Sequence, residues 1–175
     1  MALHPDLQAF LELANAQASS RPRMSQMTAA QARAAYDNAT LALDLPGDDL
    51  PTEDLDLPTR DGARIRARLY RAAPEHTAAP CLLFLHGGGY VLGGLDSHDS
   101  LCRSLALGTP CNVLAIDYRL APEHRFPTAF LDAEDALAWL LEHGGRPGPV
   151  APPQGLWGDS VRGTQGPAPC HGPRA

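Results

Sequence analysis

The sequence predicts a doubly wound α/β fold, in which helices flank a mostly parallel sheet. Residues 81–85 (CLLFL) and 111–116 (CNVLAI) are short, continuous apolar runs, as expected of strands that are buried on both faces. A helical pattern lies between them at about 98–107, and another follows at about 128–142. The order strand, helix, strand, helix favours parallel strands that are joined by helical crossovers.

Two helices are predicted ahead of this sheet. Residues 5–18 carry apolar side chains at helical spacing, and Pro5 suits the first turn of a helix. A second helix begins near Thr28 and runs through Ala-rich sequence to about Leu43. Thr28 and Gln31 have the spacing of a capping box, which marks a helix start.

A hairpin is predicted between the helices and the buried strands. Residues 52–57 and 63–70 are interpreted as two strands, joined by a turn at Asp61-Gly62. In the second strand apolar residues alternate with arginines, which indicates one buried and one exposed face. The apolar set is Ile65, Ala67 and Leu69, and the exposed set is Arg64, Arg66 and Arg68.

A last short strand at about 155–157 leads into the tripeptide Gly158-Asp159-Ser160. The sequence is thus divided into N-terminal helices (1–50), an α/β core (51–160) and a tail (161–175). The tail is rich in Pro and Gly and has almost no apolar periodicity, so it is expected to be disordered.

Composition excludes several classes of function. The net charge is −6 and no basic patch is present, so nucleic-acid binding is not expected. No apolar run reaches the length of a membrane span, and no signal peptide is recognisable. The cysteines lack metal-ligand spacing, and Cys81 and Cys111 are expected to be small buried residues. We therefore expect a cytoplasmic protein without a metal, and its oligomeric state stays open.

A run of glycines follows the first buried strand, in the motif His86-Gly87-Gly88-Gly89. Such a run lets the chain turn sharply and lets backbone N–H groups approach a developing oxyanion. It is also compatible with a plain turn or a phosphate-binding loop. A phosphate loop of the Walker type needs a lysine, and the chain contains none.

Two further motifs lie after the later strands. Gly158-Asp159-Ser160 meets half of the nucleophile-elbow pattern G-x-S-x-G, because Arg162 occupies the position of the second glycine. The segment Asp117–Pro127 alternates acids and bases between prolines. It is interpreted as an ion-paired structural loop, with Asp117 and Glu123 paired to Arg119 and Arg125 rather than acting as a general acid and base.

Together these motifs resemble the hormone-sensitive lipase family of α/β-hydrolase-fold esterases over about residues 1–160. The N-terminal helices are similar to that family's cap region. The motifs that carry the resemblance, in order, are His86-Gly87-Gly88-Gly89, the segment 94–99 (GLDSHD), Asp117–Pro127 and Gly158-Asp159-Ser160.

The resemblance implies a serine carboxylesterase that acts on small-molecule esters of short to medium acyl chains without a metal or cofactor. Ser160 would attack the ester carbonyl. Gly88, Gly89 and Val161 would donate backbone N–H groups to the oxyanion, and Gly87 would shape the turn.

The sequence departs from the family after Ser160. Val161 and Arg162 stand where the elbow tolerates little bulk. The 15 residues that follow Ser160 contain no Asp or Glu, and His171 lies too close in sequence to be the expected triad base. We interpret this as a frameshift or truncation that impairs an esterase. The alternatives are a non-catalytic ligand-binding protein of the same fold or an inactive gene product.

Overall fold

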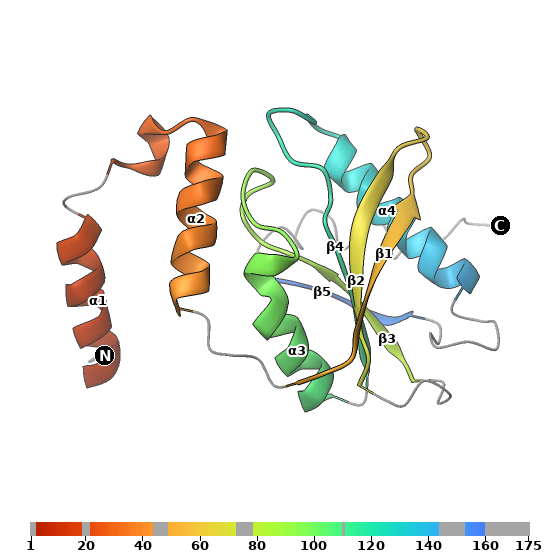
Figure 1. The fold of residues 1–175 in the computed structure, drawn as a ribbon, viewed down its shortest axis with the longest axis horizontal. Helices are drawn as coiled ribbons and strands as arrows, with labels where there is room; N and C mark the ends of the chain where they lie inside the picture. The colour runs from red at the N-terminus through yellow and green to blue at the C-terminus, as the bar shows by residue number, and fades with distance from the viewer. Residues whose placement is uncertain are drawn as a thin grey trace.

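A five-stranded sheet forms the centre of the molecule (Figure 1). The computed structural model describes residues 3–18, 22–43, 49–72, 79–109, 111–143 and 153–159. Among these residues the strand order is β1-β2-β4-β3-β5. The strands are β1 (Thr52–Pro58), β2 (Arg64–Tyr70), β3 (Cys81–Leu85), β4 (Asn112–Ile116) and β5 (Pro153–Gly158). All five lie within two residues of their predicted positions.

The parallel part of the sheet confirms the doubly wound plan. β3 pairs in parallel with β4 on one side and with β5 on the other. The crossovers are α3 (Asp99–Gly108) and α4 (Thr128–His143). β1 and β2 are antiparallel, and β2 is antiparallel to β4, so the whole sheet is mixed.

Two apolar clusters show that the helices cover opposite faces of the sheet. Leu83, Leu85 and Leu114 pack in one cluster with the buried side of α4. Phe84 and Val113 pack in the other, together with α3. Neighbouring residues of one strand thus belong to different clusters, because side chains alternate along a strand. β3 and β4 are buried on both faces, as predicted.

The hairpin β1–β2 extends the sheet with one buried face. Ile65, Ala67 and Leu69 are all buried, which confirms the predicted buried face. On the other face Arg64 and Arg66 are exposed, whereas Arg68 is half-buried because carboxylates from three elements surround it. The turn ends at Gly62, whose φ of 85° lies in the left-handed region that favours glycine. Ala67 lies opposite Ile116, the last residue of β4, so Arg66 lies beside Asp117, with which it forms an ion pair.

The predicted N-terminal helices are present as α1 (Pro5–Ala18) and α2 (Ala29–Leu43), with the short 3-10 helix η1 (Met24–Gln26) between them. The capping box is formed. The Thr28 N–H donates to Gln31 Oε1 at 3.0 Å, and the Gln31 N–H donates to Thr28 Oγ at 3.3 Å. Figure 1 shows α2 beside the loop that follows β3, so a segment far away in sequence reaches the edge of the sheet.

Two predictions about single residues had different outcomes. Cys81 is fully buried as expected, whereas Cys111 is only half-buried. Cys111 lies just before β4 begins at Asn112, and residues at the margin of a sheet are less enclosed than residues within it. The tail 161–175 lies outside the described residues. Within the part of the chain that is described, no helix is long and apolar enough to cross a membrane.

Candidate active site

The oxyanion loop, defined as residues 86–95, leaves β3 at the carboxyl edge of the sheet. Three consecutive residues have positive φ: Gly88 (119°), Gly89 (62°) and Tyr90 (64°). A Cβ on Gly88 would lie 2.2 Å from the carbonyl oxygen of Leu92, so glycine is required there. The Gly88 carbonyl accepts hydrogen bonds from the N–H groups of Val91 and Leu92, at 3.1 and 2.9 Å. The loop is therefore a tight, ordered turn.

Gly87 and Gly89 differ in what surrounds them. A Cβ on Gly87 would lie 2.7 Å from both carboxylate oxygens of Asp159, whereas no atom of the described residues lies within 4 Å of a Cβ on Gly89. Asp159 directly follows β5, and β5 pairs with β3. The sheet thus brings the residue before Ser160 against the first glycine of the run.

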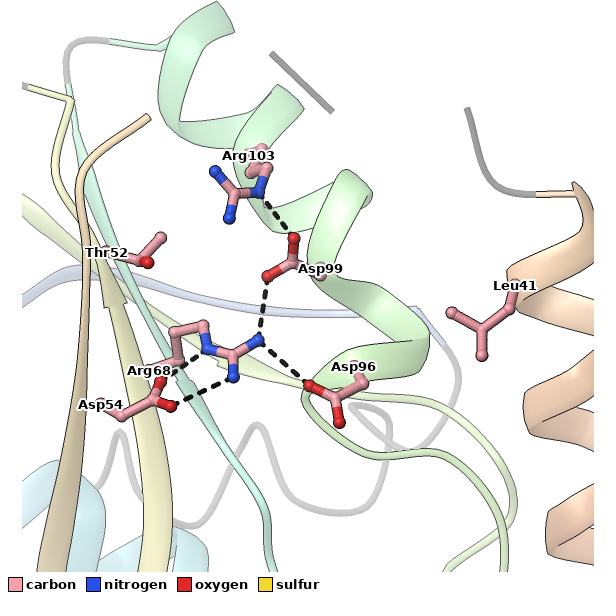
Figure 2. A pocket seen from close by; sticks show the side chains of 7 residues that line it. All are labelled: Leu41, Thr52, Asp54, Arg68, Asp96, Asp99 and Arg103. Atoms are coloured by element: carbon pink, nitrogen blue, oxygen red, sulfur yellow. Dashed lines mark hydrogen bonds and ion pairs between the residues drawn. The ribbon is translucent and has the colours of Figure 1, made fainter. Parts of the chain in front are cut away.

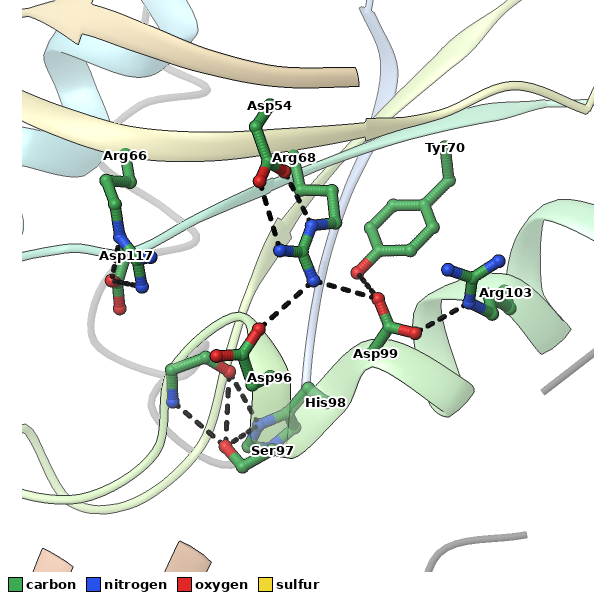
Figure 3. A network of polar contacts seen from close by, with 11 residues as sticks. Asp54, Arg66, Arg68, Tyr70, Asp96, Ser97, His98, Asp99, Arg103 and Asp117 are labelled. Atoms are coloured by element: carbon green, nitrogen blue, oxygen red, sulfur yellow. Dashed lines mark hydrogen bonds and ion pairs between the residues drawn. The ribbon is translucent and has the colours of Figure 1, made fainter. Parts of the chain in front are cut away.

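Asp159 is held on its other side by His98. The His98 Nε2 and Asp159 Oδ2 atoms are 3.1 Å apart, and His98 is only 6% exposed. On the other ring edge, His98 Nδ1 lies 2.9 Å from Ser97 Oγ. Ser97 Oγ also bonds the N–H and the carbonyl of Gly94, at 3.0 and 3.1 Å (Figure 3).

The row Ser97, His98, Asp159 has the composition of a hydrolytic triad but not its chemistry. The Ser97 hydroxyl is engaged with the backbone of its own turn, so it is not free to attack a substrate. We interpret the row as a support that fixes Asp159 and, with it, the end of β5.

His86 fixes the start of the oxyanion loop. Its ring stacks on Tyr118, with centroids 4.1 Å apart and planes at 6°. The Tyr118 hydroxyl donates to the His86 carbonyl at 2.7 Å, and His86 Nδ1 lies 2.8 Å from the Gly87 carbonyl. Because a carbonyl only accepts, Nδ1 carries the proton. Nε2 has no hydrogen-bond partner among the described residues. Burial lowers the pKa of His86, so its ring is neutral and structural.

The β4 loop, defined as residues 117–127, is ion-paired as predicted, but its predicted partners were wrong. Asp117 pairs with Arg66 at 2.8 Å, and Glu123 pairs with Arg33 at 2.6 Å. Arg119 instead binds Asp132 of α4, whose side chain is fully buried, at 2.6 Å. The prediction considered only neighbours within the loop, whereas the fold supplies closer partners from β2, α2 and α4.

A polar pocket of about 590 Å³ lies between β1, β2 and α3 (Figure 2). Its centre is Arg68, which binds carboxylates of Asp54, Asp96 and Asp99 at 2.6, 3.1 and 3.1 Å. None of the loop glycines lines this pocket, so we assign it to support of the fold. Within the described ranges, no group of three or more His, Cys, Asp or Glu residues is placed to hold a metal.

The structure therefore brings together part of the predicted site. Gly87 lies against Asp159, and Gly88 and Gly89 follow it in the same turn, whereas Ser160, Val161 and His171 lie outside the described residues. Sequence reasoning missed the His98–Asp159 contact and the Arg33–Glu123 pair, because Arg33 lies in an Ala-rich helix without a motif.

Comparisons with known proteins agree with this arrangement. A family model described as alpha/beta hydrolase fold matches residues 82–164. Ethyl acetate hydrolase from Pseudomonas putida is 43% identical over 169 residues, which cover 94% of this chain and 53% of that protein. Esterase LipI from Mycobacterium tuberculosis is 44% identical over 102 residues, which cover 57% of this chain and 32% of that protein.

Solved structures show the same fold. A hyperthermophilic esterase from Pyrobaculum calidifontis superposes with a TM-score of 0.79 at 36% identity, over 92% of this chain and 50% of that one. An ester-hydrolase from the metagenome of Lake Arreo superposes with a TM-score of 0.85 at 30% identity, over 97% and 54%. The chain spans about half the length of the Pseudomonas putida hydrolase and of the two solved esterases, and its match with LipI covers about a third of that protein. It belongs to the hormone-sensitive lipase-like family of α/β-hydrolase-fold proteins, whose members matched here are carboxylesterases.

Proposed function

We propose that the protein is a serine esterase that hydrolyses small carboxylic esters through an acyl-enzyme. One observation carries the proposal: the oxyanion loop, with its three positive φ values, lies directly against Asp159, the residue before Ser160. A hydroxyl that follows Asp159 would therefore stand beside backbone N–H groups that are free of bulky side chains. This is the arrangement that acyl transfer requires.

In the proposed reaction Ser160 Oγ adds to the ester carbonyl carbon and gives its proton to a general base. The carbonyl oxygen becomes an oxyanion, which the N–H groups of Gly88, Gly89 and Val161 stabilise. The bond to the alcohol then breaks, and the alcohol leaves with that proton. Water hydrolyses the acyl-serine to the carboxylic acid by the same steps.

This proposal does not assign the general base to a residue. His86 stacks on Tyr118, and its protonated nitrogen is bound to Gly87. His98 uses both ring nitrogens on Ser97 and Asp159. Because both histidines have structural partners, a second candidate is a ligand-binding protein of the same fold that does not turn substrate over.

A hydrolysis assay separates the two candidates. The purified chain is incubated with p-nitrophenyl butyrate, beside the Ser160→Ala variant and the control Ser104→Ala, which changes an exposed serine of α3. An esterase shows turnover that S160A abolishes and S104A leaves unchanged. A folded circular-dichroism spectrum without turnover favours the ligand-binding candidate, and turnover that survives S160A contradicts the proposed nucleophile.

A further inference from the structure

Arg33 of α2 connects three parts of the molecule. Its Nε donates to the carbonyl oxygen of Val91 at 2.8 Å, and its Nη2 donates to the carbonyl oxygen of Ala121 at 2.7 Å. The guanidinium also binds both carboxylate oxygens of Glu123, at 3.0 and 2.6 Å. One side chain thus joins α2, the oxyanion loop and the β4 loop.

One of the two contacted carbonyls lies in the turn of the oxyanion loop, and the other belongs to a residue that binds this turn. Val91 directly follows the three residues with positive φ, and its N–H closes the turn onto Gly88. The Ala121 N–H donates to the carbonyl of Tyr90 at 2.8 Å. Arg33 therefore binds the loop at Val91, and it also binds the residue that holds Tyr90. A turn in sparsely populated φ space persists only where its surroundings hold it.

Only an arginine can make this set of contacts. Its planar fork presents five N–H donors in fixed directions, so one group can bind two carbonyls and a bidentate carboxylate. A lysine at position 33 would keep the charge but would offer a single point from which to donate. The Arg33 side chain is 25% exposed, so water competes only in part for these bonds.

A second side chain of α2 supports the same docking. Tyr36 lies one helical turn after Arg33, and its ring stacks over His98, with centroids 6.5 Å apart and planes at 29°. His98 in turn binds Asp159. The two side chains of this helix face thus reach the glycine side and the serine side of the candidate site.

We propose that Arg33 is a positioning residue, which fixes the oxyanion loop through the carbonyls of Val91 and Ala121. The inference rests on the proposed function for its catalytic consequence, because Arg33 touches no reacting atom. Its structural consequence is independent of turnover: without the guanidinium fork, the turn at residues 88–92 opens more often.

Hydrogen–deuterium exchange tests the structural consequence directly. The N–H groups of Val91 and Leu92 are the reporters, since both bond to the Gly88 carbonyl. Arg33→Ala and Arg33→Lys should both speed exchange of these groups by about tenfold or more, because alanine removes every bond of the guanidinium fork and lysine cannot bind both carbonyls and the carboxylate at once. Arg60→Ala is the matched control, since it removes an arginine that pairs with Glu134 and Asp135 elsewhere, and it should leave both reporters unchanged.

Glu123→Gln separates the carbonyl fork from the ion pair. This variant keeps the Arg33 bonds to Val91 and Ala121, so exchange at the reporters should stay within about threefold of the wild type. If E123Q speeds exchange as much as R33A does, the ion pair rather than the fork holds the loop, and the inference is overturned. Unchanged exchange in R33K overturns it too, and this variant serves if R33A does not fold.

The catalytic consequence is read with p-nitrophenyl butyrate. Arg33→Lys should lower kcat by about tenfold or more and change KM by less than about threefold, because an oxyanion hole acts on the transition state. A rise in KM at constant kcat contradicts a positioning role. If the wild type shows no turnover that depends on Ser160, the proposed function fails, while the exchange comparison still decides whether Arg33 holds the loop.

Discussion

The oxyanion loop and the β4 loop leave adjacent parallel strands at the same edge of the sheet, yet they hold their shapes by different means. The first uses glycines, and its turn at Gly88 leaves no space for a side chain. The second uses charged side chains such as Arg119, bound to the buried Asp132. A backbone that presents its own N–H groups gives up side chains, so its neighbour has to supply the contacts that hold it.

Two hydrogen bonds pass between the loops. The Tyr118 hydroxyl binds the carbonyl of His86, and the Ala121 N–H binds the carbonyl of Tyr90. Both donors come from the β4 loop, and both acceptors lie in the oxyanion loop. Because the oxyanion loop depends on these donors, a substitution that loosens the β4 loop should lower the free energy of unfolding more than a substitution of a single glycine.

The largest effect is expected from Asp132→Asn, which removes the charge that holds Arg119. The Asp132 side chain is fully buried and binds both the backbone N–H and the guanidinium of Arg119. The change should lower the free energy of unfolding by about 2–3 kcal/mol, because a fully buried carboxylate loses its charge-assisted bonds to Arg119, which keeps only its ion pair with Asp61. Urea unfolding measures this. The control Glu134→Gln breaks a partly exposed pair with Arg60 and should cost less than about 1 kcal/mol.

A smaller effect is expected from Gly88→Ala, with Gly89→Ala as its matched control. At Gly88 the new Cβ would meet backbone at 2.2 Å, whereas at Gly89 it would meet no atom of the described residues within 4 Å. Both positions have positive φ, so both variants carry backbone strain. Thermal or urea unfolding should show a loss of about 2 kcal/mol for G88A and about 1 kcal/mol for G89A. Equal losses would mean that the turn adapts more readily than its geometry indicates.

Tyr118→Phe tests the link between the loops with the ring stack kept. The lost hydroxyl donates to the His86 carbonyl at 2.7 Å, and both groups are buried. The free energy of unfolding should fall by about 1–2 kcal/mol, because a buried carbonyl loses its donor. A variant as stable as the wild type in urea would show that the loops do not depend on each other through this bond.

The smallest effect concerns pH. Burial lowers the pKa of His86 in the folded chain, whereas the unfolded chain has a pKa of about 6.5 at this residue. As pH falls below 6.5 the unfolded state takes up the proton first, so the folded state loses stability, by at most about 1.4 kcal/mol per pH unit. His86→Phe keeps a ring on Tyr118 and removes this titration. Unfolding curves at pH 7.5 and 5.5 should differ less for H86F than for the wild type. An identical pH dependence would contradict a buried neutral His86.

The fold was largely predictable from sequence, because its strands and helices have clear periodicities. Neighbouring residues of the runs 81–85 and 111–116 pack into different apolar clusters in the folded sheet. The continuous apolar character of both runs already indicates two buried faces. The glycine motif predicted the turn. The ion-pair partners were not predictable from sequence. Asp117, which follows β4, pairs with Arg66 of the neighbouring strand β2, and the two residues are about 50 positions apart in the chain. A charge finds its partner by tertiary placement, and one sequence carries no local signal for it.

The position of Arg68 has a consequence for which substitutions the chain tolerates. Its guanidinium binds carboxylates from three separate elements: Asp54 of β1, Asp96 of the 3-10 helix η2 (Asp96–His98), and Asp99 of α3 (Figure 3). Without it, three like charges would face one another, and a lysine could not divide its bonds among them in fixed directions. We therefore expect that no other residue, lysine included, can replace Arg68 alone. A stable variant would have to replace the three aspartates as well.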